Sequence, residues 1–178
     1  NSYHRFHTYG NLLRDRPIYR PEQAYVSDIT YLRTRQGFVY LFLITDACSR
    51  KIVGWDLSSS LGIEGGIKAL KMALRNTKDT KGLIHHSDRG IQYCSKEYTG
   101  LLKQKKVSIS MTEENHCYEN SLAERVNGIL KQEFMLGSEW PDELSVRRSV
   151  EQCIRIYNTK RPHWSLKLKT PEQVHGAA

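Results

Sequence analysis

The sequence predicts one α/β domain in which helices flank a mixed five-stranded sheet. Three observations lead to this prediction. Short runs of β-branched and aromatic residues come first, apolar residues at helical spacing then alternate with further short runs, and 178 residues are enough to bury one sizeable core. Because only short turns separate the first three runs, we expect an antiparallel meander followed by strands that alternate with helices.

The lead-in and the three strands of the meander are expected in the first third of the chain. Residues 1–23 are polar, and several Arg and Pro residues break any periodicity, so we interpret this segment as a linker or extended lead-in. Strands are expected over 24–32, 38–45 and 51–57, where β-branched and aromatic residues cluster between turn-forming segments.

Helices and two short strands are expected in the rest of the chain. Apolar residues at helical spacing predict a helix over 63–75, and a short apolar run predicts a strand over 83–86. Further on we expect a helix over 96–105, a strand over 107–110, a polar loop over 111–118, a helix from about residue 120, a helix over 142–158 and an extended tail. The last helix has an apolar stripe made of Val146, Val150, Cys153, Ile154 and Tyr157.

The charge balance favours a polyanionic partner. Lys and Arg number 27 against 19 Asp and Glu, which gives a net charge of +8 and a pI near 9.4. The excess is moderate and is spread along the chain, so we expect a broad nucleic-acid-facing surface and no separate basic arm.

Cysteine spacing and hydropathy restrict the protein class further. The four cysteines, Cys48, Cys94, Cys117 and Cys153, contain no C-x-x-C pair, which argues against a zinc knuckle or a dense disulfide framework and fits a reduced cytoplasmic setting. No apolar run reaches the roughly 18 residues of a membrane span, and no charged leader precedes an apolar segment. We therefore expect a soluble protein with no membrane partner.

Three acidic residues are the candidate catalytic groups. Asp28 lies inside an apolar run, and Asp88 follows the run over 83–86. Glu124 lies on an expected helix, with 35 residues between it and Asp88. Carboxylates at strand ends and on a helix face can hold one or two hard cations against a phosphodiester. Taken singly, Asp28 fits a solvent-facing strand residue, Asp88 a structural turn residue and Glu124 an exposed helix residue equally well.

Helical phase separates two faces of the helix that carries Glu124. Leu122, Val126, Ile129 and Leu130 line one face, and Glu124 and Lys131, seven residues apart, share the opposite one. Glu133 falls near the apolar face, which is unfavourable unless a basic neighbour pairs with it.

These motifs carry a resemblance to a known family. The segments Ser27–Tyr31, His85–Tyr93 and Glu119–Glu124, together with Lys131, resemble the integrase catalytic core of bacterial insertion-sequence transposases. The resemblance is greatest to the insertion-sequence-three family, whose core is similar to that of retroviral integrases, and it covers about residues 20–174. The segment 157–163, with Thr170 and Pro171 beyond it, also resembles the C-terminal signature of that family.

The resemblance implies a fold, a reaction and partners. It implies a ribonuclease H-like fold with a core over 24–160, a lead-in over 1–23 from a missing N-terminal DNA-binding region, and a tail over 161–178. It also implies that Asp28, Asp88 and Glu124 bind Mg²⁺ or Mn²⁺, with two ions in the active complex. The implied reaction is cleavage and strand transfer of DNA at mobile-element ends, with target DNA as second substrate and a homo-oligomer assembled on DNA.

Further residues are assigned as DNA contacts or as packing groups. Lys131 is expected to hold a DNA phosphate, and Arg89, Gln92 and Tyr93 are expected to approach DNA from the turn at Asp88. His85 and His86 are interpreted as packing groups or as supports of the site, not as metal ligands, and Asp46 and Asp56 as turn or strand-end residues. A string of aromatic and basic residues near the C-terminus either binds DNA or lies against the core, and for Trp164 we favour packing: Tyr157, Lys160, Arg161, His163, Trp164 and Lys167. Glu119 and Ser121 depart from the family pattern, which usually has Asp and Ala at those positions, and Glu119 becomes a rival third carboxylate.

Two other functions remain compatible with the sequence. A ribonuclease H-like or resolvase-type nuclease would share the fold and only hydrolyse, and it would have no need of Lys131. A catalytically inactive DNA-binding or assembly module would tolerate loss of Asp88.

Overall fold

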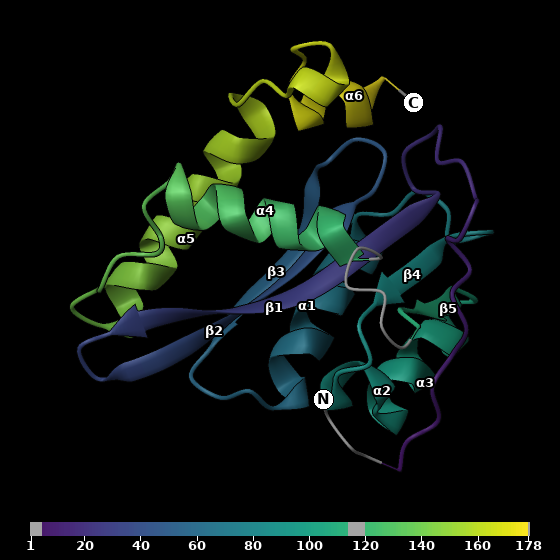
Figure 1. The fold of residues 1–178 in the computed structure, drawn as a ribbon, viewed down its shortest axis with the longest axis horizontal. Helices are drawn as coiled ribbons and strands as arrows, with labels where there is room; N and C mark the ends of the chain where they lie inside the picture. Colours follow the sequence, from purple (N-terminus) through teal and green to yellow (C-terminus); the bar gives the residue numbers. More distant parts are fainter. Residues whose placement is uncertain (1–4, 114–119, 178) are drawn as a thin grey trace.

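A five-stranded mixed sheet forms the centre of the computed structural model, which describes residues 5–113 and 120–177. Strands β1 (Ala24–Thr34), β2 (Gly37–Asp46) and β3 (Ile52–Ser58) form the predicted antiparallel meander, and β4 (Ile84–Ser87) and β5 (Ser108–Met111) add to it in parallel. The strand order is β3-β2-β1-β4-β5 (Figure 1). The predicted fold class is confirmed.

Helices follow the expected order with two differences. They are α1 (Ile63–Arg75), α2 (Ile91–Cys94), α3 (Lys96–Gln104), α4 (Ser121–Gln132), α5 (Glu143–Thr159), the 3₁₀ turn η2 (Trp164–Leu166) and α6 (Pro171–Gly176). The short helix α2 was not expected. The expectation of an extended tail was wrong, because Thr170 forms a capping box with Gln173 and Pro171 supplies a preset φ at the first helical position.

Each face of the sheet is covered by a different set of helices (Figure 1). On one face α1 and α3 pack on Tyr25, Phe42 and Ile44. On the other, α4 and α5 pack on Leu41 and Leu43. The five predicted stripe residues of α5 are all buried there: Val146, Val150, Cys153, Ile154 and Tyr157.

Close packing of α1 on the sheet depends on two glycines. A side chain at Gly65 would overlap the ring of Phe42, and one at Gly54 would overlap the backbone of Ala69. The helix therefore lies directly on β2 and β3 and leaves the opposite face of the sheet to α4.

The lead-in packs against the body of the domain. Met111 N donates a hydrogen bond to Gly10 O at 3.3 Å, and Leu12 N donates to Ser110 Oγ at 2.8 Å, so this segment runs along β5. Leu13 and Ile18 contact a small core cluster near the start of β1. None of the helices in the described residues is long and apolar enough to cross a membrane.

Strand β1 is an open edge over part of its length. It pairs with β4 only through Ala24–Val26, and among the described residues its next contact on that side is the bridge between Thr34 and Trp140. The middle of β1, where Asp28 lies, is therefore left without a strand neighbour on that side.

Candidate active site

The register of two parallel strands places Asp28 and Asp88 side by side. Val26 of β1 pairs with His86 of β4, and each aspartate lies two residues beyond its member of this pair. Both carboxylates therefore lie at or beyond the end of the β1–β4 ladder, on its carboxyl side, which is where open α/β sheets bind ligands. The Gly90 amide donates to Asp88 Oδ1 at 2.9 Å and fixes the turn that presents this side chain.

Helix α4 brings the third acid to the same place. Asn127 Nδ2 donates a 2.7 Å hydrogen bond to Asp28 Oδ2, which fixes this helix over the middle of β1. Glu124 lies three residues before Asn127, so both project from the same side of α4. Asn127 is buried and Glu124 is exposed, so the acid lies on the solvent side of this contact.

The electrostatics of Asp28 reflect this convergence. Burial raises the pKa of Asp28 to about 6, the negative charge of Asp88 adds to the rise, and Glu124 contributes less. Hydrogen bonds from the Ile29 backbone and from Asn127 oppose it. Partial burial also raises the pKa of Asp88, against the Gly90 hydrogen bond. Burial and the neighbouring carboxylates therefore both disfavour the ionised form of Asp28.

A buried polar network supports the site from the opposite face of the sheet. His85 Nε2 lies 2.7 Å from Ser27 Oγ and 2.9 Å from Tyr98 Oη. Burial, together with neighbouring His86, lowers the pKa of His85 to about 3, so its ring is neutral at physiological pH. The prediction that His85 and His86 are packing groups is confirmed, since both are buried and His86 Nδ1 lies 2.8 Å from Ser110 Oγ.

Lys131 lies beside the open edge of β1. Its Nζ is 4.4 Å from the centroid of the exposed Tyr31 ring, which in turn packs edge-to-face on Phe38 at 5.3 Å. Partial burial lowers the pKa of Lys131, and the attraction of Asp28 opposes this shift. The ammonium group is therefore held within electrostatic reach of the acidic cluster.

The residues after Asp88 take different places from those expected. Gln92 is buried and donates to Leu61 O at 2.8 Å, and Tyr93 is buried against Tyr98 at 5.3 Å between ring centroids. Their placement favours a structural role over the predicted DNA contact. Arg89 is half-buried and borders an open hollow of about 370 Å³ on the surface, which remains compatible with a DNA contact.

Glu119 lies outside the described residues, as does most of the predicted polar loop. The structure therefore describes only one of the two candidates for the third carboxylate, Glu124, whose charge acts on Asp28.

Glu133 was expected to need a basic neighbour, and Arg161 is that neighbour. Arg161 donates hydrogen bonds to both carboxylate oxygens of Glu133, at 2.6 and 2.7 Å.

The three candidate ligands fit hard divalent cations in their chemistry, although their side chains do not yet converge on one metal position. All three groups are carboxylates, the ligands that Mg²⁺ and Mn²⁺ prefer, and burial together with the charge of Asp88 raises the pKa of Asp28. Within residues 5–113 and 120–177, no three His, Cys, Asp or Glu side chains are already close enough together to hold one ion. Asp28, Asp88 and Glu124 are the residues that would hold such a metal.

Comparison with known proteins identifies the family of this chain. The description "Integrase core domain" applies to two family matches, one over residues 18–117 and another over 105–171. The chain belongs to the integrase core domain family. It is 37% identical over 142 residues to the transposase of insertion sequence element IS629 from Shigella sonnei. It is also 36% identical over 154 residues to the transposase InsF of IS3A from Escherichia coli.

The match covers most of this chain and part of those relatives. It includes 80% of the chain and 48% of the Shigella protein, and 86% of the chain and 54% of the Escherichia coli protein. The chain thus spans about half the length of the curated relatives it matches. The resemblance to the insertion-sequence-three family is confirmed.

Solved structures show the same fold at low sequence identity. The HTLV-2 integrase catalytic core domain in complex with magnesium aligns with a TM-score of 0.69 and 18% identity, over 88% of this chain and 97% of that one. A simian T-cell lymphotropic virus intasome chain aligns with a TM-score of 0.72 and 19% identity, over 96% of this chain and 58% of that one. The integrase core therefore has the predicted ribonuclease H-like fold.

Two asparagines of the site do not stand out in the sequence. Asn127 bonds to Asp28, and Asn120 Nδ2 donates to Ser27 O at 3.2 Å, so both tie α4 to β1. The signal for Asn127 was its place one helical turn after Glu124, on the face that bears the acid. Asn120 lies inside the segment Glu119–Glu124 that carries the family resemblance, but its type and position alone predicted no contact with β1.

Proposed function

We propose that this chain is the catalytic core of a transposase that cleaves DNA at mobile-element ends and joins it to target DNA, with divalent metal held by Asp28, Asp88 and Glu124. The observation that carries the proposal is the register of β1 and β4, which presents two carboxylates side by side while α4 holds Glu124 nearby. Membership of the integrase core domain family supports the same reaction class.

The chain's own residues have distinct roles in this proposal. Asn127 orients the Asp28 carboxylate by its 2.7 Å hydrogen bond. Lys131 binds a DNA phosphate beside Tyr31, a contact that gives affinity without reading sequence. Bound Mg²⁺ or Mn²⁺ would supply activation of the attacking oxygen and stabilisation of the leaving 3′-oxygen during in-line displacement.

Ionisation of Asp28 is linked to occupation of the site. Burial first, and then the negative charges of Asp88 and Glu124, raise the pKa of Asp28 and disfavour the ionised form. The three carboxylates would hold a divalent cation, whose charge would offset their mutual repulsion. The HTLV-2 integrase core forms a complex with magnesium, which supports the choice of metal.

The partners in the proposal are DNA and further copies of the chain. The net charge of +8 supports DNA binding, and the trimeric and intasome forms of the structural neighbours support assembly. Since an upstream segment is expected to read the element ends, the core alone should bind DNA without sequence preference. That binding should weaken steeply with salt.

Incubation with Mg²⁺ or Mn²⁺ and end-labelled DNA tests the proposal. Joined products longer than the labelled strand are expected from the wild type and none from Asp88→Asn, with DNA binding retained. Shortened products alone would point to a hydrolase. Equal behaviour of wild type and Asp88→Asn would point to a module without catalysis.

A further inference from the structure

The segment between α5 and α6 forms a compact loop that closes on itself. His163 N donates to Lys169 O at 3.0 Å, and Leu168 N donates to His163 O at 2.9 Å. Inside this closure lies the 3₁₀ turn Trp164–Leu166, followed by two residues in the left-handed region, Lys167 at φ 54° and Leu168 at φ 62°. Residues 160–169 are named the tryptophan loop below.

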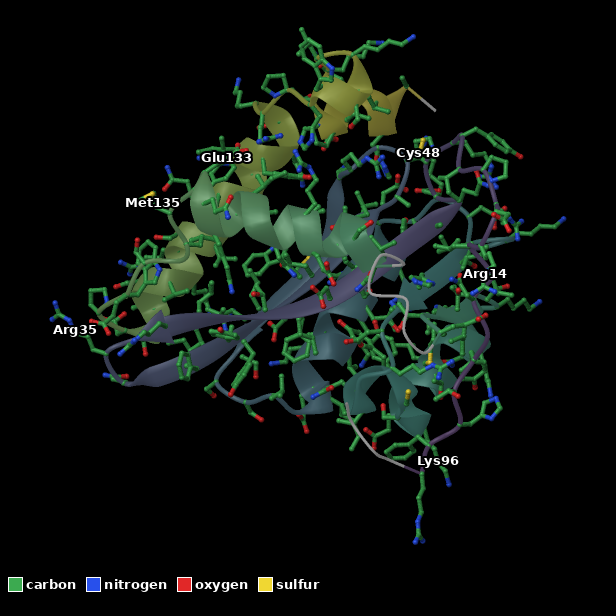
Figure 2. All side chains as sticks on the ribbon, viewed as in Figure 1. Arg14, Arg35, Cys48, Lys96, Glu133 and Met135 are labelled. Atoms are coloured by element: carbon green, nitrogen blue, oxygen red, sulfur yellow. The ribbon has the colours of Figure 1, made fainter. Side chains whose placement is uncertain are left out.

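The tryptophan loop is anchored to the body of the domain at both ends. At its start the His163 ring is buried edge-to-face on Tyr157, with centroids 5.0 Å apart, and Arg161 pairs with Glu133 at the end of α4. Figure 2 shows Glu133 at that end of α4, and Figure 1 shows the segment between α5 and α6 above it, at the upper edge of the molecule. The loop is therefore held as a rigid projection.

The α6 end is held by separate contacts. Lys51 Nζ lies 2.8 Å from Glu172 Oε2, and His175 Nδ1 lies 2.9 Å from Ser49 Oγ. Both contacts join α6 to the turn between β2 and β3. The tryptophan loop thus connects two elements that are each fixed on the core.

The loop presents its largest apolar side chains to solvent. Trp164 is 87% exposed and Leu168 is 61% exposed, whereas Trp55 and Trp140 pack against the core. The expectation that Trp164 packs on the core was therefore wrong. Large apolar groups held out on a rigid support are unfavourable in water and mark a contact surface.

The charge around Trp164 identifies the kind of partner. Lys160, Lys167 and Lys169 are exposed, and no Asp or Glu occurs from Lys160 to Pro171. Because Arg161 is already paired with Glu133, the three lysines supply the local positive charge. The lysines would attract a polyanion, and no acid in the segment would repel it. The indole ring would stack on the flat apolar faces of the units of that polyanion.

We propose that the tryptophan loop binds DNA by stacking Trp164 on an unpaired base while its lysines contact the flanking phosphates. This inference rests on the proposed function for DNA as substrate and adds a second contact away from the carboxylates. A base inside a duplex offers no free face, so the preferred ligand is single-stranded or frayed DNA. Leu168, the other exposed large apolar residue of the loop, adds to its apolar surface.

Tryptophan fluorescence and DNA affinity test the inference in metal-free buffer. The probe is a single-stranded oligothymidine of about 20 nucleotides, with a blunt hairpin duplex as comparison. Addition of the single strand should quench the wild-type fluorescence, because base stacking quenches indole. Trp164→Ala should weaken single-strand binding by about 5- to 100-fold and duplex binding less.

Matched variants separate stacking from charge and from folding. Trp164→Phe keeps a ring, so it should bind within about threefold of wild type while the quenching disappears. Replacing the three lysines by Ala should lower the salt dependence by about two units of slope, since each phosphate contact contributes about 0.7. Trp55→Phe should leave the quenching in place. Unchanged thermal unfolding of Trp164→Ala excludes a folding defect, because the ring is exposed.

Two results would overturn the inference. One is equal single-strand affinity for wild type and Trp164→Ala. The other is a dimer for the wild type and a monomer for Trp164→Ala in sedimentation, with equal DNA binding by both proteins. The ring would then contact a second copy of the chain and not DNA. The binding test contains no metal and measures no joining, so a failed joining reaction leaves it unaffected. Conversely, failure here leaves metal-dependent joining intact.

Discussion

Two aspartates of the β1–β2 hairpin, Asp28 and Asp46, show how differently one residue type is used at two places in a sheet. Asp46 ends β2, is 0% exposed, and accepts four hydrogen bonds, three from backbone amides and one from the Ser49 hydroxyl. Asp28 accepts one side-chain hydrogen bond, from Asn127, and lies near two other carboxylates.

The number of donors around each carboxylate explains the difference in role. A buried carboxylate with several donors stabilises the turn that provides them. A carboxylate that faces like charges costs stability until a cation arrives, and such groups are found at functional sites. Both residues look alike in the sequence, as an acid at or inside an apolar run, so their surroundings decide between them.

The largest expected effect is on DNA joining. Asp28→Asn and Asp88→Asn remove charged ligands, so joining should fall on the order of a thousandfold or more, as expected when several kcal/mol of transition-state stabilisation are lost. Gel assays with labelled DNA measure this. Asp46→Asn serves as the matched control and should retain joining per folded molecule.

Asp46→Asn should lower the stability of the fold, although it should leave joining per folded molecule intact. Asp46→Asn can place its amide nitrogen opposite the Glu22 N–H, which now donates at 2.7 Å, so unfolding free energy should fall on the order of 2 kcal/mol. Urea denaturation at pH 7 measures the change. An unaltered midpoint would mean that the donors around Asp46 are satisfied without its charge.

Loss of the Asp28–Asn127 hydrogen bond should have an intermediate effect. Asn127→Ala leaves the carboxylate less well oriented, and loss of such supporting contacts at metal sites costs about 10- to 100-fold. The change should appear both in joining and in the Mg²⁺ concentration for half-maximal rate. Reduced joining with unchanged metal dependence would assign Asn127 a role in folding alone.

The raised pKa of Asp28 predicts a pH-dependent gain in stability on its removal. A carboxyl whose folded pKa is about 6 favours folding below its unfolded pKa near 3.8, and this contribution is lost as pH rises through 6. In metal-free buffer, Asp28→Asn should therefore be more stable than wild type at pH 8 by on the order of 1–3 kcal/mol. The gain should shrink below pH 4. Thermal unfolding at both pH values measures it.

The smallest effect is expected at the far end of α4. Glu133 and Arg161 form a bidentate but exposed pair, so Glu133→Gln should cost less than about 1 kcal/mol at low salt and still less at high salt. Denaturation at two salt concentrations checks this. A cost well above that value would show that the pair holds the tryptophan loop in place.

Local patterns were enough to predict most of the sheet and helices. The apolar stripe from Val146 to Tyr157 and the short runs of the meander follow directly from periodicity. The tail was mispredicted because Trp164 and Leu168 break the rule that large apolar groups are buried, and because the capping box at Thr170 was overlooked.

The sequence singles out three candidate acids, whereas the surroundings of these acids could be predicted less well. Asp28, Asp88 and Glu124 stand out by type and spacing, and the structure brings them to one region. Gln92 and Tyr93 have polar groups that suit DNA, yet the turn at Gly90 starts a short helix that carries both into the core. Tertiary packing of this kind is not encoded in the local sequence pattern.

Anomalous diffraction from crystals grown with Mn²⁺ tests the central claim most directly. We predict density within about 2.1 Å of carboxylate oxygens of Asp28 and Asp88, with Glu124 completing the site. Ordered Mn²⁺ bound elsewhere, while both of these aspartates are well defined and hold no ion, would contradict it.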